Sequence, residues 1–123
     1  MKSELNWIIG KTIQSIQLSR DEDYNNNITS VSLLIDGKTI VFNIDTDTDS
    51  IRIDNAIQEN VNHNEELKFN NLFVNKKVVS FWFPINHLGF NDVFILGLEK
   101  FVPTHFFTSV SSCIKICSVN QLD

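Results

Sequence analysis

Apolar and polar residues alternate most clearly in two neighbouring runs of the first half of the chain. The runs cover 31–35 and 40–44, and Asp36-Gly37 lies between them. Asp-Gly favours a type I′ turn, because both central residues of that turn need a positive φ. Period-two alternation buries one face of a strand. We therefore predict a β-hairpin here, followed by a shorter strand over 51–54.

Periodicity and turn residues predict the other elements in the same way. We expect helices over about 3–9 and 64–75, and strands over 11–18, 76–83, 92–98, 101–108 and 112–119. Gly10 and Asn75 follow the two helices and suit the left-handed backbone that often ends a helix. Residues 19–30 lack apolar periodicity and are expected to form a loop.

Three positions predict irregularities within these strands. Ile13 has the opposite parity from Ile16 and Leu18, which indicates a bulge or a twist between them. Gly97 interrupts a strand that is apolar on both faces and predicts a bulge or a close backbone approach. Pro103 cannot donate a ladder hydrogen bond, so its strand should lie at an edge or start irregularly.

The chain, 123 residues long, is expected to form a single domain built from two similar halves. The segments that align are 10–18 with 75–83, 31–35 with 94–98, and 49–53 with 112–116. The halves span about 1–54 and 64–119, and a polar linker, 55–63, joins them. Each half would be a short helix followed by antiparallel strands. The predicted class is α+β, mainly β, with the halves forming a two-sheet sandwich or one barrel-like sheet.

Composition limits the cellular environments that suit this chain. Ten Phe and two Trp supply a large core, and no apolar run approaches the roughly 20 residues that span a bilayer. The amino terminus lacks a signal-peptide pattern, and Cys113 and Cys117 are too far apart on one strand for a disulfide. We expect a cytoplasmic protein that does not bind a membrane.

The net charge of −5 is concentrated in the first half. Residues 1–54 contribute −4 and residues 55–123 contribute −1. An acidic surface disfavours direct binding to nucleic acid and is compatible with a basic protein partner. Simple solubility is the alternative explanation of the same charge.

Candidate chemistry is sparse. The DTDTDS run at 45–50 begins like a calcium loop, but Ser50 and Ala56 occupy the positions of its glycine and its bidentate acid. A His87–Asp92–Cys113 trio has suitable residue types for nucleophilic catalysis, but no motif brings its members together. We predict no catalytic residues, no cofactor and no metal site.

The segments IIGKTIQSI, DTDTDSIRI and LGFNDVFILGLEKF resemble the pattern of a small uncharacterised bacterial domain family. That pattern includes a D-S-I-x-I strand and an N-x-x-G-[FY]-x-D turn, which is 86–92 in this chain. Small acidic chains of this kind also resemble the immunity proteins of contact-dependent growth inhibition and related toxin systems. The resemblance implies tight binding that blocks the active site of a toxin. Immunity proteins share no signature, so it implies no functional residues.

The leading hypothesis is therefore a non-enzymatic immunity protein with a basic toxin partner. The residues expected to face that partner are Asp21, Glu22, Asp23, Asp45, Asp47 and Asp49. A second hypothesis is a ligand-binding or enzymatic domain with a pocket between the halves and with His87 and Asp92 near its mouth. A third is an accessory domain that dimerises through an edge strand.

Overall fold

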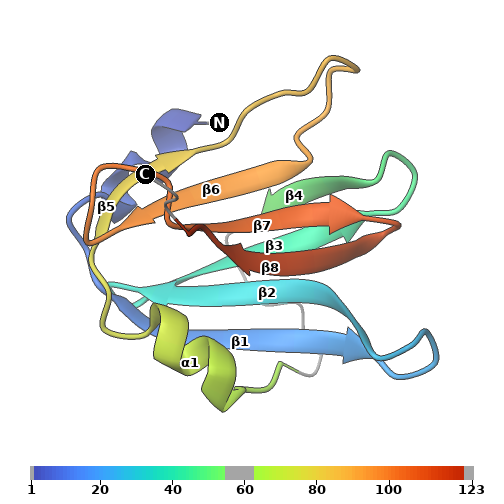
Figure 1. Ribbon diagram of the computed structural model, residues 1–123, viewed down its shortest axis with the longest axis horizontal. Coiled ribbons are helices and arrows are strands. Elements are labelled where there is room, and N and C mark those ends of the chain that lie inside the picture. The colour runs from blue at the N-terminus through green and yellow to red at the C-terminus, as the bar shows by residue number, and fades with distance from the viewer. Residues whose placement is uncertain (1, 55–62, 121–123) are drawn as a thin grey trace.

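The computed structural model describes residues 2–54 and 63–120, which form two four-stranded antiparallel sheets (Figure 1). The first half contains the 3-10 helix η1 (Lys2–Ile8) and strands β1 (Ile13–Asp21), β2 (Asn27–Ile35), β3 (Lys38–Asp45) and β4 (Ser50–Asp54). The second contains α1 (Leu67–Phe73), β5 (Val78–Trp82), β6 (Val93–Leu98), β7 (His105–Val110) and β8 (Cys113–Ser118). Strands pair in sequence order within each sheet. The mainly β prediction is confirmed, and the barrel-like alternative is wrong because the sheets do not close.

The β2–β3 hairpin confirms the clearest sequence pattern. Ile35 pairs with Lys38, and the two residues between them have φ values of +50° for Asp36 and +77° for Gly37. These angles are the ones that a type I′ turn requires. The following strand, β4, pairs with β3 as expected.

The predicted loop over 19–30 is wrong, since β1 continues to Asp21 and β2 begins at Asn27. The polar residues in this stretch are compatible with strands because distant partners satisfy them. The Ser30 hydroxyl lies 3.0 Å from Nε2 of His63, and Arg20 bonds Glu66. Of the predicted linker, 55–62 lies outside the described residues.

The predicted irregularities are present. The β1–β2 register shifts between Ile13 and Ser15, and the β5–β6 register shifts between Val78 and Ser80. A Cβ added at Gly97 would lie only 2.7 Å and 2.8 Å from the carbonyl oxygens of residues 100 and 102, so glycine permits this close approach. β7 begins only after Pro103 and lies between β6 and β8, so the proline gives it an irregular start rather than an edge position.

The segments leading into β1 and β5 cross through four backbone hydrogen bonds. These bonds run from Gly10 to Val78, from Val78 to Lys11, from Ile13 to Lys76 and from Asn75 to Ile13, at 2.7 to 2.9 Å. The four bonds form two matching pairs when each residue of the first half is replaced by the residue 65 positions later, and the reverse. The bond from Gly10 to Val78 then corresponds to the bond from Asn75 to Ile13. Gly10 and Asn75 occupy matching places and have positive φ values of +84° and +66°. The crossing is therefore symmetric about an approximate two-fold axis.

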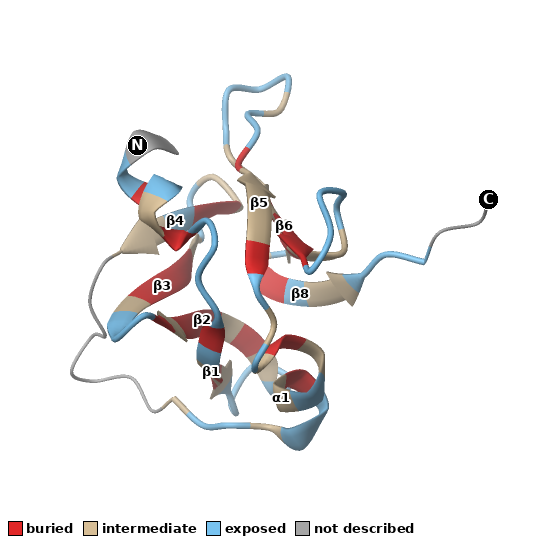
Figure 2. Cartoon of the chain, turned by 90° about the vertical axis from the view of Figure 1, so that its left-hand side faces the viewer, coloured by how far each residue is buried: buried red, intermediate tan, exposed pale blue. Residues whose placement is uncertain are grey.

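One aromatic cluster joins the two sheets. The ring of Phe42 on β3 lies 4.7 Å from that of Phe94 on β6 and 5.1 Å from that of Phe107 on β7, measured between centroids. All three side chains are fully buried, and the core around them draws residues from both sheets. Buried segments of both sheets are visible in Figure 2, with exposed residues concentrated in the loops. The space between the halves is thus filled by side chains.

Candidate protein-binding site

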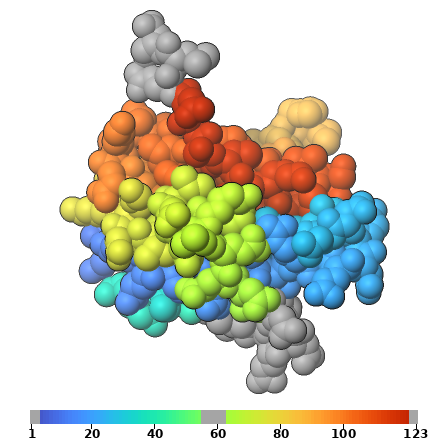
Figure 3. Space-filling view, turned by 60° about the horizontal axis from the view of Figure 1, so that its bottom comes forward, coloured from blue at the N-terminus to red at the C-terminus, as the bar shows by residue number. Residues whose placement is uncertain are grey.

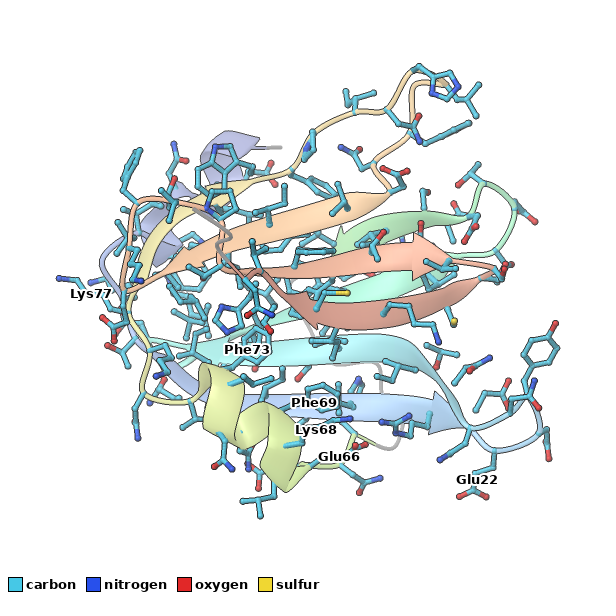
Figure 4. The ribbon with its side chains drawn as sticks, in the orientation of Figure 1. Glu22, Glu66, Lys68, Phe69, Phe73 and Lys77 are labelled. Atoms are coloured by element: carbon cyan, nitrogen blue, oxygen red, sulfur yellow. The ribbon has the colours of Figure 1, made fainter. Side chains whose placement is uncertain are left out.

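The β1–β2 loop, residues 22–26, presents the first group of predicted acidic residues. Asp21, Glu22 and Asp23 are all exposed. Asn25 and Asn26 reverse the chain with φ values of +59° and +56°, a conformation that Asn tolerates better than most residues. The loop projects from one end of the sheets in Figure 1, and Glu22 points outward in Figure 4.

A forked ion pair fixes the base of this loop. Arg20 donates from Nε and Nη2 to the two carboxylate oxygens of Glu66, at 2.7 Å and 2.9 Å. Its Nη1 also donates to the carbonyl oxygen of Asn26, at 3.0 Å. The hydrogen bonds raise the pKa of Arg20 and lower the pKa of Glu66. Because Glu66 already pairs with this guanidinium, the exposed carboxylates of the loop gain little neutralisation from it.

A concavity of about 520 Å³ lies beside the ion pair. Its walls are Leu18, Arg20, Asp21, Glu22, Asn26, Thr29, Asn64 and Glu66. In Figure 3 the β1–β2 hairpin, in blue, protrudes beside the yellow-green surface of α1. The acidic loop therefore borders a hollow at the surface.

The second acidic group lies in and beside the β3–β4 turn, at the same end of the molecule in Figure 1. Asp47 is exposed, whereas Asp45 and Asp49 are half-buried. The carboxylate of Asp49 accepts a hydrogen bond from the amide of Ser112 at 2.9 Å, and its carbonyl accepts one from the hydroxyl of Ser109 at 2.6 Å. Asp49 therefore ties this turn to the second sheet. Among the described residues, no hydrogen bond or ion pair joins the two acidic groups.

In the described part of the chain, no hydrogen bond or ion pair joins the side chains of His87, Asp92 and Cys113, the residues considered for catalysis. His87 is exposed in the β5–β6 loop, whereas Cys113 is buried and its thiol donates to the carbonyl oxygen of Val110 at 3.0 Å. Cys113 and Cys117 are both free thiols. Within residues 2–54 and 63–120, no group of three or more His, Cys, Asp or Glu side chains is arranged to hold a metal ion.

Two further histidine contacts were not predicted. Ser30 Oγ and His63 Nε2 are within hydrogen-bond distance, and Ser30 is only 3% exposed, so this contact is shielded from solvent. The His105 ring packs on Phe73 at 4.8 Å, and its Nδ1 lies 2.8 Å from the hydroxyl of Thr104. Burial, and secondarily the charge of Lys76, lowers the pKa of His105. Both histidines thus contact buried or partly buried side chains.

None of the described helices is long and apolar enough to cross a membrane. No curated protein and no solved structure matches the chain. A protein family does match, over residues 1–123, under the description "Family of unknown function (DUF6334)". The chain is a member of that family.

Proposed function

We propose that this chain is a non-enzymatic binding protein, and most concretely a cytoplasmic immunity protein that neutralises a cognate bacterial toxin. The observation that supports the proposal is the projecting acidic loop. Asp21, Glu22 and Asp23 are exposed together, and the cation next to them, Arg20, is paired with Glu66. A basic partner, such as a nuclease, would meet this loop first.

The expected benefit of such a loop is fast association. Complementary surface charge accelerates encounter and loses its effect as salt screens it over a Debye length of about 8 Å at physiological ionic strength. Asp47 extends the proposed surface because it is exposed in the β3–β4 turn. Asp45 and Asp49 contribute negative potential from half-buried positions.

The alternative of a ligand pocket between the halves has less support. Phe42, Phe94 and Phe107 fill that space and are inaccessible to solvent. The hollows found in the described part of the chain are open at its surface, and those lined by residues of both halves do not reach this aromatic cluster. A binding function that uses the exterior fits this packing better.

The first experiment is affinity purification of the tagged chain from its own host, at low and at high salt, followed by mass spectrometry. We expect one stoichiometric basic partner whose retention falls at high salt. Retention of background proteins alone would contradict the proposal.

A charge-matched pair of variants then locates the surface. The triple variant Asp21→Asn, Glu22→Gln, Asp23→Asn should reduce the association rate with the captured partner by roughly tenfold or more at low salt. The control, Glu4→Gln, Asp36→Asn, Glu99→Gln, removes the same charge from exposed positions outside the loop and should change the rate much less. Equal effects would show that net charge matters and the loop does not.

A further inference from the structure

The outer edge of β5 differs from the matching edge of the first sheet. In the first sheet the matching edge strand is β1, and its residue Leu18 exchanges two backbone hydrogen bonds with Asn64, each 2.8 Å long. Adding 65 to the number of Leu18 gives Phe83, immediately after β5. In the described part of the chain, no extended segment pairs with β5 in this way beyond Val78. β5 thus ends its sheet with an edge that can accept another strand.

An uncharged groove with aromatic residues in its wall lies along this edge. η1 and β5 enclose a hollow of about 300 Å³, lined by Asn6, Ile9, Ser80, Phe81, Trp82, Phe83 and Pro84. None of these side chains carries a charge. Ile9 is 42% exposed, and Phe81 and Trp82 are only half-buried. The groove therefore leaves aromatic surface within reach of a partner.

The β5–β6 loop continues the same surface with a preorganised tip. The Asn86 carboxamide oxygen accepts hydrogen bonds from the amides of Leu88 and Phe90, at 2.9 Å and 3.2 Å. Gly89, with a φ of +90°, permits the reversal between them. Ile85 and Leu88 are 65% and 67% exposed. An ordered apolar tip loses little conformational entropy when it docks, and the loop projects from the molecule in both Figures 1 and 2.

Charge indicates which partner suits this surface. Between Lys77 and Glu99, Asp92 is the sole charged residue in the sequence, while the whole chain has a net charge of −5. Two copies of an acidic chain repel each other wherever acidic surfaces meet, so they approach at the lowest electrostatic cost through a face that lacks charge. A contiguous exposed apolar surface on a charged chain is typical of an association site.

We propose that the β5 edge, its groove and the β5–β6 loop form a self-association surface on which a second copy of this chain docks about a two-fold axis. The same face serves both copies, as an isologous dimer requires. The β5 sequence of the second copy, VVSFW, is itself an uncharged apolar strand and matches the groove in chemistry.

Sedimentation equilibrium of the purified full-length chain, over a wide range of concentration, tests the proposal without any other protein. We expect a monomer–dimer equilibrium that tightens as salt is raised, because salt screens the repulsion between the acidic copies. This sign is opposite to that expected for the acidic loop and its basic partner. The two proposals can therefore fail separately.

Leu88→Ser should abolish the dimer, and Phe101→Ser is its control because Phe101 is 73% exposed in a different loop. Neither exposed substitution should change the melting temperature. Ser80→Glu places a charge in the groove and should also abolish the dimer. A chain that stays monomeric at every concentration overturns the proposal. A dimer that survives both Leu88→Ser and Ser80→Glu, or that Phe101→Ser disrupts equally, also overturns it.

Discussion

The β1–β2 and β5–β6 loops occupy matching places in the two sheets and differ in chemistry. The loop between β1 and β2 is acidic, and Arg20 and two Asn residues hold its shape. The loop between β5 and β6 is apolar and is shaped by one Asn side chain and a glycine. The strands that support them have the same order and the same bulge. Similar strand frames can thus present unrelated surfaces, since the exposed side chains of the loops have no part in the shared core.

The contrast extends to the whole halves. Of the large hydrophobic residues that are exposed in the described chain, the first half holds only Ile9 and Tyr24, and the second half holds the other eight. Most of the net negative charge belongs to the first half. We interpret the molecule as two related sheets, one specialised for electrostatic contact and the other for apolar contact.

The largest expected effect comes from breaking the core that unites the halves. Phe42→Ala removes a ring that contacts both Phe94 and Phe107, and should reduce the free energy of unfolding by about 3–5 kcal/mol. Trp7 and Trp82 lie one in each half. In single-tryptophan versions, Trp7→Phe and Trp82→Phe, urea titrations by fluorescence should show coincident transitions. Two separate transitions would show that the halves unfold independently.

A smaller effect should distinguish two glycines, Gly37 in the turn after β2 and Gly97 near the end of β6. Gly97→Ala pushes a Cβ against two carbonyl oxygens and should cost about 1–3 kcal/mol of stability. Gly37→Ala meets no atom within 4 Å, so only its φ of +77° opposes the new side chain, at a cost of about 1 kcal/mol. Urea unfolding measures both. A larger loss at Gly37 would contradict the close approach assigned to Gly97.

The smallest effect is the response to acid of two groups of the second half, His105 packed on Phe73 and Glu66 in its ion pair with the first half. Because burial lowers the pKa of His105, the folded protein takes up a proton less readily than the unfolded chain, whose imidazole titrates near 6.5. The contribution of neutral His105 to the free energy of unfolding is therefore complete above pH 6.5 and declines as the pH falls below that value. The hydrogen bond that Glu66 accepts from Arg20 lowers the pKa of Glu66. The stabilisation from Glu66 is therefore complete above 4.5, the pKa in the unfolded chain, and declines as the pH falls below it.

Melting temperatures across this pH range provide the measurement. His105→Phe retains a ring against Phe73 and should remove the decline that begins near pH 6.5, leaving the later decline intact. Glu66→Gln should reduce only the decline below pH 4.5. An unchanged profile for His105→Phe would mean that another group is responsible.

The features that could be predicted from the sequence are those determined by neighbouring residues. The two residues Asp36-Gly37 are enough to predict the turn that they form. The change of parity after Ile13 predicts a bulge, because side chains alternate between the two faces of a strand. The end of β1 could not be predicted in this way. Arg20 depends on Glu66, 46 residues away in sequence. A local pattern contains no trace of such a partner.

The candidate site shows the same division. The exposure of Asp21, Glu22 and Asp23 follows from their place in a polar turn. The different role of Asp49 depends on Ser112, which is 63 residues away and approaches only when the two sheets meet. Likewise, the apolar character of the β5–β6 loop is visible in the sequence, but the open edge beside it is apparent only in the strand order.

The crossing of the two chain segments bears on how the protein folds as it is synthesised. A nascent chain that has emerged only as far as β4 contains all four strands of the first sheet but lacks residues 75–78. The amides of Gly10 and Ile13 must then bond to water, and Phe42 has no aromatic partners. The first half is expected to leave the ribosome with its apolar face uncovered, a stage at which nascent chains are prone to aggregate and chaperones bind them.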